Sequence, residues 1–152
     1  MLASLMTSLL ALTAISVSSP LPAAKRDTAE LYILSNCYNN LTHASYASAF
    51  WYYPDFLPDY PEPQAVGVIN AQKAVTFEGL KIAIKAPFKL TAAIPKNATL
   101  ATYQEIVASA TISSFAGPAA AMKGTGEAFY SPATNVNCYY NYAVRDNQTE
   151  DP

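Results

Sequence analysis

The chain has 152 residues, 51% of them hydrophobic, and a formal net charge of −2. This length supports a single domain with one core. The slight excess of acidic residues argues against a protein that binds nucleic acid or anionic membranes, because both need clustered Lys and Arg.

An uncharged apolar run opens the chain, from Leu2 to Val17, and small residues end it. The run is close to the length of a membrane span, so an uncleaved anchor is one interpretation. Its N-terminal position and the small residues favour the other, a signal peptide over residues 1–18, although no Lys or Arg precedes the run. The dibasic pair Lys25-Arg26 then predicts a short propeptide over 19–26 and a mature domain over 27–152.

Two strands are predicted near the start of this domain. The first runs from Leu31 to Tyr38, with Leu31, Ile33 and Cys37 on one face. The second is the densest aromatic stretch of the chain, Tyr46 to Tyr53, whose aromatic side chains alternate onto both faces. Such a strand is either covered on both sides or presents an aromatic binding platform to solvent.

A stiff surface loop is predicted from Pro54 to Pro63, because its four prolines remove backbone donors and fix φ. Beyond it, Ala65 to Ile69 and Lys73 to Glu78 are predicted to form strands joined by a turn near Asn70.

The strongest strand signal lies between Leu80 and Ile94. Every even position there is apolar, while Lys81, Lys85 and Lys89 take odd positions, and this period of two is typical of a half-buried strand. A helix would line the lysines on one stripe but would place Pro87 in its interior, at a cost of about 3 kcal/mol. We therefore predict two strands, or one bent strand broken near Pro87.

The following stretch has two interpretations. Residues 102–105 match a capping box that would start a short helix at Ile106, whereas the Ser and Thr residues at alternate positions favour a strand from Ile106 to Phe115. We favour the strand. The last predicted strands are Thr125 to Tyr130 and Cys138 to Val144, the latter with its even positions on one face. The polar tail from Asp146 is expected to fray.

These patterns predict an all-β, single-domain protein of about eight or nine short strands, folded as an antiparallel β-sandwich or a small β-barrel. Cys37 and Cys138, the two cysteines, are expected to form one disulfide in an oxidising compartment and to join the first strand to the last. Asn40, Asn97 and Asn147 each begin an Asn-X-Thr sequon, so each predicts an exposed site of N-glycosylation.

The sequence offers little for catalysis. His43 is the only histidine and lies in a predicted turn, and we find no motif for a metal, a nucleotide or another cofactor. Asp55, Asp59 and Glu62 lie close together in the proline-rich loop and could supply the paired carboxyls of a small glycoside hydrolase. We favour solvated turn residues for them. The same oxygens could bind calcium, but their spacing is not diagnostic.

Recognition is the better use of this loop. Tyr and Trp supply a large contact area at low entropic cost, and prolines preorganise it. The residues predicted to bind a ligand are Trp51, Tyr53, Asp55, Phe56, Asp59, Tyr60 and Glu62. The competing interpretation places the aromatic side chains in the core, with the loop covering one end of the sheet.

The leader, the dibasic processing site, the single cysteine pair and the short β domain together resemble the small secreted proteins of filamentous fungi, a group with effector-like and allergen-like β domains. The chain has fewer cysteines than the disulfide-dense members of that group. The resemblance implies an extracellular or cell-wall location. With the aromatic loop, it suggests a non-catalytic protein that binds an extracellular protein of a host or a cell-wall polysaccharide. A small carbohydrate-active hydrolase and a structural cell-wall or cell-surface protein are the alternatives.

Overall fold

The computed structural model describes residues 30–53, 60–112 and 115–146. Most of these residues lie in strands or in the turns between them. The elements are β1 (Leu31–Asn39), β2 (Ser45–Tyr52), β3 (Ala65–Asn70), β4 (Lys81–Ile84), β5 (Leu90–Ala93), the 3-10 helix η1 (Lys96–Leu100), β6 (Ile106–Ile112), β7 (Phe115–Lys123), β8 (Ala128–Tyr130) and β9 (Val136–Asp146). The predicted signal peptide, propeptide and tail beyond Asp146 lie outside the described residues, as does Asn147.

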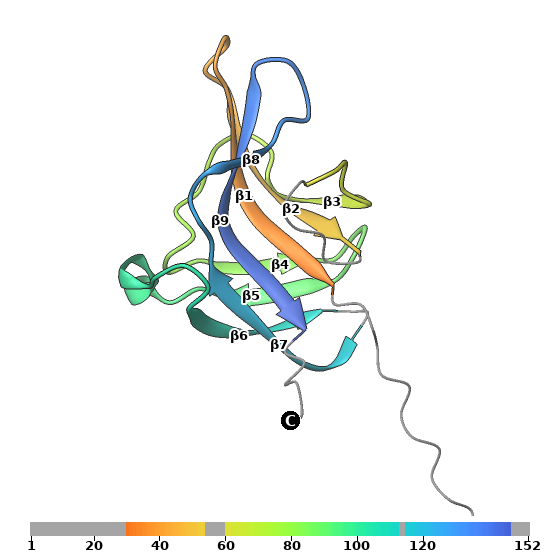
Figure 1. The fold of residues 1–152 in the computed structure, drawn as a ribbon, viewed down its shortest axis with the longest axis vertical. Helices are drawn as coiled ribbons and strands as arrows, with labels where there is room; N and C mark the ends of the chain where they lie inside the picture. The colour runs from red at the N-terminus through yellow and green to blue at the C-terminus, as the bar shows by residue number, and fades with distance from the viewer. Residues whose placement is uncertain (1–29, 54–59, 113–114, 147–152) are drawn as a thin grey trace, which may run out of the picture.

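The strands form one antiparallel sheet in the order β3-β2-β1-β9-β7-β6-β5-β4, and β8 pairs with β9 outside this path. Most neighbours in the sheet are also neighbours in the chain, whereas β9 inserts between β1 and β7. The two ends of the order, β3 and β4, contact each other, so the sheet curls into a nearly closed barrel (Figure 1). The predicted all-β fold is confirmed, and of its two forms the barrel is the one observed.

One face of the strands fills the barrel interior. The stretch from Leu80 to Ile94 contributes much of it, because its even positions from Ile82 onward are buried there, apart from the exposed Ala86. The three lysines of this stretch are exposed. Two strands, β4 and β5, are separated by residues 85–89, which include Pro87. The prediction of two half-buried strands broken near Pro87 is confirmed.

A second apolar cluster lies on the outer face of β1, β2 and β9. Its covering residues include Phe129 and Tyr130 from β8, and Tyr60 from the segment that precedes β3. Because apolar side chains cover both faces of β1, every residue from Leu31 to Cys37 is buried. The aromatic strand β2 is also covered on both sides, which is the first of the two interpretations given above.

A β-bulge at Asn141 reverses the face that β9 presents to the interior. Leu34 of β1 pairs with Tyr142, but the next residue pairs with Tyr140, so Asn141 is an extra residue in the ladder. The Asn141 side-chain oxygen accepts a hydrogen bond from the Asn36 backbone N–H at 2.9 Å. The prediction that the even positions from 138 to 144 share one face is therefore wrong. Cys138 and Tyr140 belong to the outer cluster, whereas Tyr142 and Val144 belong to the interior.

The predicted strand from Lys73 to Glu78 is absent from the described structure. Side chains satisfy its backbone groups instead of a neighbouring strand. The Asn36 side chain accepts from the Val75 N–H at 2.9 Å and donates to the Val75 carbonyl at 2.8 Å. The Ser45 hydroxyl accepts from the Ala74 N–H at 3.0 Å. The segment thus crosses from one end of the sheet to the other without joining the ladder.

The strand interpretation of the residues after 105 is confirmed by β6. The capping-box residues form a turn rather than the start of a helix. The Glu105 carboxylate accepts from the Thr102 backbone N–H at 2.9 Å, and the Glu105 N–H donates to the Thr102 carbonyl at 3.0 Å. The strand predicted over residues 125–130 is shorter than expected and covers only Ala128–Tyr130.

The disulfide between Cys37 and Cys138 is confirmed and joins β1 to β9. The two residues are direct partners in the β1–β9 ladder. The bond closes a loop across 101 positions of sequence. A loop of this length corresponds to a stabilisation of about 4–5 kcal/mol through the entropy of the unfolded chain.

Candidate functional site

The structure places the residues of the predicted binding loop in different surroundings. Asp55, Phe56 and Asp59 lie outside the described residues. Trp51 is half-buried against the barrel interior, and its ring stacks on Tyr32 with centroids 6.4 Å apart. Trp51 therefore occupies the core position that the competing interpretation assigns to it.

The other three described residues of the predicted binding site differ in exposure. Tyr53 is 44% exposed, and its backbone N–H donates to the Gln64 side chain at 3.0 Å. Glu62 is exposed. Tyr60 is half-buried, and it lies beside a pocket. Of the four predicted ligand-binding residues that the structure describes, Tyr60 is the one that lines this pocket.

The Tyr60 ring is fixed by the outer aromatic cluster. It meets Tyr52, Phe129 and Tyr140 edge-on, with centroid distances of 5.5, 5.3 and 6.0 Å. Aromatic pairs of this geometry are worth roughly 0.5–1.5 kcal/mol each beyond their burial. Strands β2, β8 and β9 therefore position the ring together.

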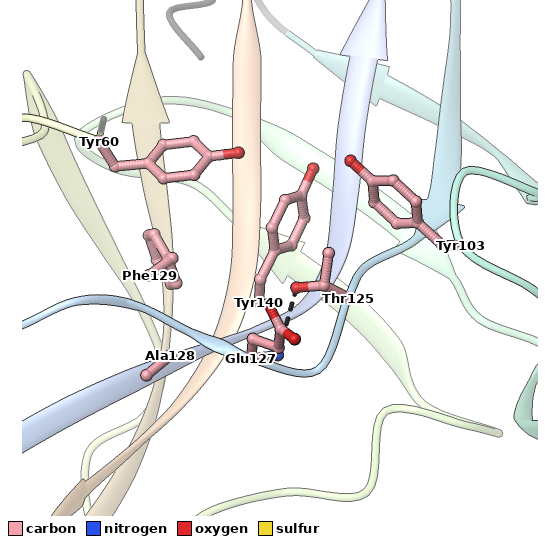
Figure 2. Close-up of a pocket in the computed structure, with 7 residues that line it drawn as sticks. All are labelled: Tyr60, Tyr103, Thr125, Glu127, Ala128, Phe129 and Tyr140. Carbon is pink, nitrogen blue, oxygen red and sulfur yellow. Dashed lines mark hydrogen bonds between the residues drawn. The ribbon is translucent and has the colours of Figure 1, made fainter. Parts of the chain in front are cut away.

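The pocket beside Tyr60 has a volume of about 390 Å³, which is within the range of small-molecule sites. Its lining comes from the segment before β3, the turn before β6, the segment that contains β8, and β9. The lining residues are Tyr60, Tyr103, Thr125, Glu127, Ala128, Phe129 and Tyr140 (Figure 2). Residues far apart in the chain thus build one hollow.

The three tyrosine hydroxyls of the pocket are directed toward a shared space. Figure 2 shows the hydroxyl groups of Tyr60, Tyr103 and Tyr140 pointing toward the same region, with the Phe129 ring beside Tyr60. Glu127 is exposed, and its backbone N–H donates to the Thr125 hydroxyl at 3.2 Å. Tyrosine hydroxyls both donate and accept, whereas a carboxylate only accepts. The pocket can therefore pair with a ligand that carries several hydroxyl groups and an apolar face.

Burial keeps the phenols of the neighbouring cluster neutral. It raises the pKa of Tyr52 well above its ordinary value of 10.0, and the nearby Tyr130 and Tyr60 add to the shift. Burial also raises the pKa of Tyr130, with a smaller contribution from the Glu62 charge. These hydroxyl groups thus remain hydrogen-bond donors into alkaline solution.

We compared the chain with protein-family models, curated proteins and solved structures. No family model, curated protein or solved structure matches it. Within the described residues, no three His, Cys, Asp or Glu side chains gather where they could hold a metal ion. No helix in that part of the chain is long and apolar enough to cross a membrane. The assignment of the site therefore rests on its own geometry.

A separate cluster of ionisable groups lies where β7, β9 and the segment before β4 meet. The Lys123 ammonium contacts the Glu78 carboxylate at 3.0 Å and donates to the Tyr142 hydroxyl at 2.9 Å. Tyr142 donates in turn to Glu78. Burial alone would raise the pKa of Glu78, but the hydrogen bonds from Tyr142 and Lys123 outweigh it and lower that pKa. We assign this cluster a structural role, because its groups satisfy one another.

Sequence reasoning missed most of the pocket. The predicted strand from Thr125 to Tyr130 would include Glu127, yet this residue lies in the turn segment just before β8. Tyr140 was expected to share a face with Tyr142, but the bulge at Asn141 separates them. Tyr60 is the pocket residue that a local signal identified, because it lies in the predicted loop of prolines and aromatic residues.

Proposed function

We propose that the protein is secreted and acts without catalysis, by binding a cell-wall or host glycan in the pocket beside Tyr60. The observation that carries this proposal is the convergence of three tyrosine hydroxyls beside an aromatic wall, with a carboxylate at the rim. Sugar rings present apolar C–H faces and hydroxyl groups together, so aromatic rings and phenols can pair with both. The disulfide supports the secreted location, because disulfides persist in oxidising compartments.

We favour binding over glycoside hydrolysis because of the number of carboxyl groups in the described lining of the pocket. Hydrolysis needs two carboxyls on opposite sides of the scissile bond. Among the described residues that line the pocket, Glu127 carries the only carboxyl group. A single carboxylate suffices to accept hydrogen bonds from ligand hydroxyls.

The first test measures depletion of the secreted protein from solution by insoluble chitin, cellulose and β-glucan. We expect selective depletion by one polysaccharide. The Tyr103→Ala substitution should weaken that binding by about 1 kcal/mol, or roughly fivefold, because it removes one aromatic face and one hydroxyl. Tyr103 is 50% exposed, so its loss should leave the fold intact.

The matched control is Tyr38→Ala, since Tyr38 is 40% exposed but does not line the pocket. This variant should bind like the wild type. No depletion by any of the polysaccharides would contradict the glycan proposal and direct the search to protein partners. If Tyr103→Ala and Tyr38→Ala weakened polysaccharide binding equally, the pocket would not be the binding site.

A further inference from the structure

Exposed apolar side chains gather near the two sequons in the described part of the chain. Eight large apolar side chains are exposed among the described residues. Half of them flank a sequon, namely Tyr38 and Leu41 around Asn40, and Leu100 and Ile106 beside Asn97. Exposed apolar side chains beside a sequon offer a surface on which an attached sugar could pack.

The Asn97 sequon lies at the edge of a hollow. Its middle residue, Ala98, is buried and fixes helix η1 to the barrel, whereas Asn97 and Thr99 are exposed. The hollow has a volume of about 240 Å³, and Asn97 lines it with Leu100 and Ile106. Leu100 is 85% exposed and Ile106 is 57% exposed. A group attached to Asn97 would therefore begin at the hollow that these two side chains line.

The Asn40 sequon lies at the tip of the β1–β2 hairpin, which extends beyond the barrel (Figure 1). The turn is ordered, because the Asn39 side chain accepts from the Leu41 and Thr42 N–H groups at 2.9 Å each. The exposed Tyr38 ring lies two residues before Asn40. Cα atoms two residues apart are separated by at most about 7 Å, so a sugar on Asn40 can reach this ring.

We propose that Asn40 and Asn97 carry N-linked glycans whose first sugars pack on these neighbouring apolar side chains. In this modification the bond from sugar C1 to a polyisoprenyl pyrophosphate donor breaks, and a bond from C1 to the asparagine amide nitrogen forms. The amide loses one proton, and the pyrophosphate carrier is the leaving group. The proposal rests on the secreted location but not on the ligand pocket. The glycan is thus part of the protein's own surface.

The test expresses the full chain in a secreting eukaryotic host and measures the occupancy of each site by mass spectrometry of its glycopeptides. We expect both asparagines to be occupied. Thr99→Ala removes the acceptor sequon, whereas Thr99→Ser keeps it and serves as the matched control. The Thr99→Ala variant should bind an apolar fluorescent dye roughly twofold or more above the control, because Leu100 and Ile106 are uncovered. Adding Leu100→Ser to Thr99→Ala should reverse most of the increase.

The same comparison applies at the hairpin, where Asn40→Gln should raise dye binding and an added Tyr38→Ala should reverse it. An unoccupied Asn40 or Asn97 overturns the proposal for that residue, and so does retention of an unglycosylated chain in the cell. Equal dye binding by Thr99→Ala and Thr99→Ser would show that the Asn97 glycan does not cover Leu100 and Ile106. Polysaccharide depletion is measured separately through Tyr103, so the pocket and the glycan proposals can fail independently.

Discussion

Glu78 shows how one side chain can join segments that are distant in sequence. Its carboxylate accepts hydrogen bonds from Lys123 of β7 and Tyr142 of β9, and these lower its pKa against the opposing effect of burial. Stability that arises from a lowered carboxyl pKa is fully present above the unfolded pKa of about 4.3. It is lost as the pH falls through the lower folded pKa.

We expect Glu78→Gln to lower the free energy of unfolding by about 1.5–3 kcal/mol at pH 7, the usual contribution of hydrogen bonds to a charged group. The difference from the wild type should shrink as the pH is lowered from 7 to 3, because the folded wild-type carboxyl is also protonated once the pH falls through its lowered pKa. Urea denaturation at the two pH values measures both quantities.

A suitable control for this experiment is Glu105→Gln. The Glu105 side chain is exposed, and its carboxylate accepts hydrogen bonds from Thr102 in the same turn. It should cost less than Glu78→Gln at pH 7. A Glu78→Gln effect that stays constant between pH 7 and pH 3 would show that the carboxylate charge is not what stabilises the cluster.

Sequence patterns could not identify this cluster or the pocket, for the same physical reason. Glu78 lies 45 residues from Lys123 and 64 from Tyr142, and local periodicity contains no information on such pairs. Tyr60 was found because prolines and aromatic residues adjoin it in sequence. Tyr103 and Tyr140 line the same pocket, but their proximity to Tyr60 depends on the folding of the sheet and could not be predicted from local sequence.

The bulge in β9 decides which side chains enter the barrel. Before Asn141 the even positions face outward, and after it they face inward. Asn141 supports this switch by accepting the Asn36 N–H at 2.9 Å, so the backbone donor beside the extra residue is satisfied. An extra residue of this kind leaves no mark in an alternating pattern. This is why the strand was predicted correctly but the facing of Tyr142 and Val144 was wrong.

Asn141→Ala should therefore destabilise the protein by about 1–3 kcal/mol, because the Asn36 N–H loses its acceptor. The midpoint of urea unfolding gives the value. Asn137→Ala is the comparison, since Asn137 lies on the same strand opposite Tyr38 and outside the bulge. Equal losses from the two substitutions would mean that the bulge does not depend on this hydrogen bond.

At the scale of the whole molecule, closure of the barrel depends on a seam between β3 and β4. Gly67 of β3 faces Ile84 and Phe88 so closely that a Cβ atom would lie 2.9 Å from each. A side chain at this position must push the two ends of the sheet apart. The absence of a side chain at residue 67 is therefore part of how the sheet closes.

We expect Gly67→Val to destabilise the fold by roughly 1–3 kcal/mol through overpacking at the seam. Thermal unfolding should show a lower midpoint, and amide exchange should increase first in β3 and β4. Val68→Thr is the control, because Val68 is on the same strand but 61% exposed. An unchanged midpoint for Gly67→Val would indicate that the seam is already open in solution.

The sequence was sufficient to predict the all-β fold class, but not to predict that the sheet closes into a barrel. Alternation in β4 and β5 is a property of each strand alone, so these strands could be predicted. Closure of this sheet depends on whether its end strands, β3 and β4, approach each other. The segment between these two strands carries a misleading strand pattern. Its backbone is instead bonded to Asn36 and Ser45 from another part of the sheet.

The position of β9 has a consequence for how the protein is made. It is the last of the described strands to leave the ribosome, yet it lies in the middle of the sheet and carries Cys138. Until it emerges, the hairpins β1 to β3 and β4 to β7 can form only as two separate half-sheets. Each half would display an unpaired edge, which is the state most prone to aggregation. Biosynthesis thus ends with a single step in which one segment joins both halves and brings the two cysteines together.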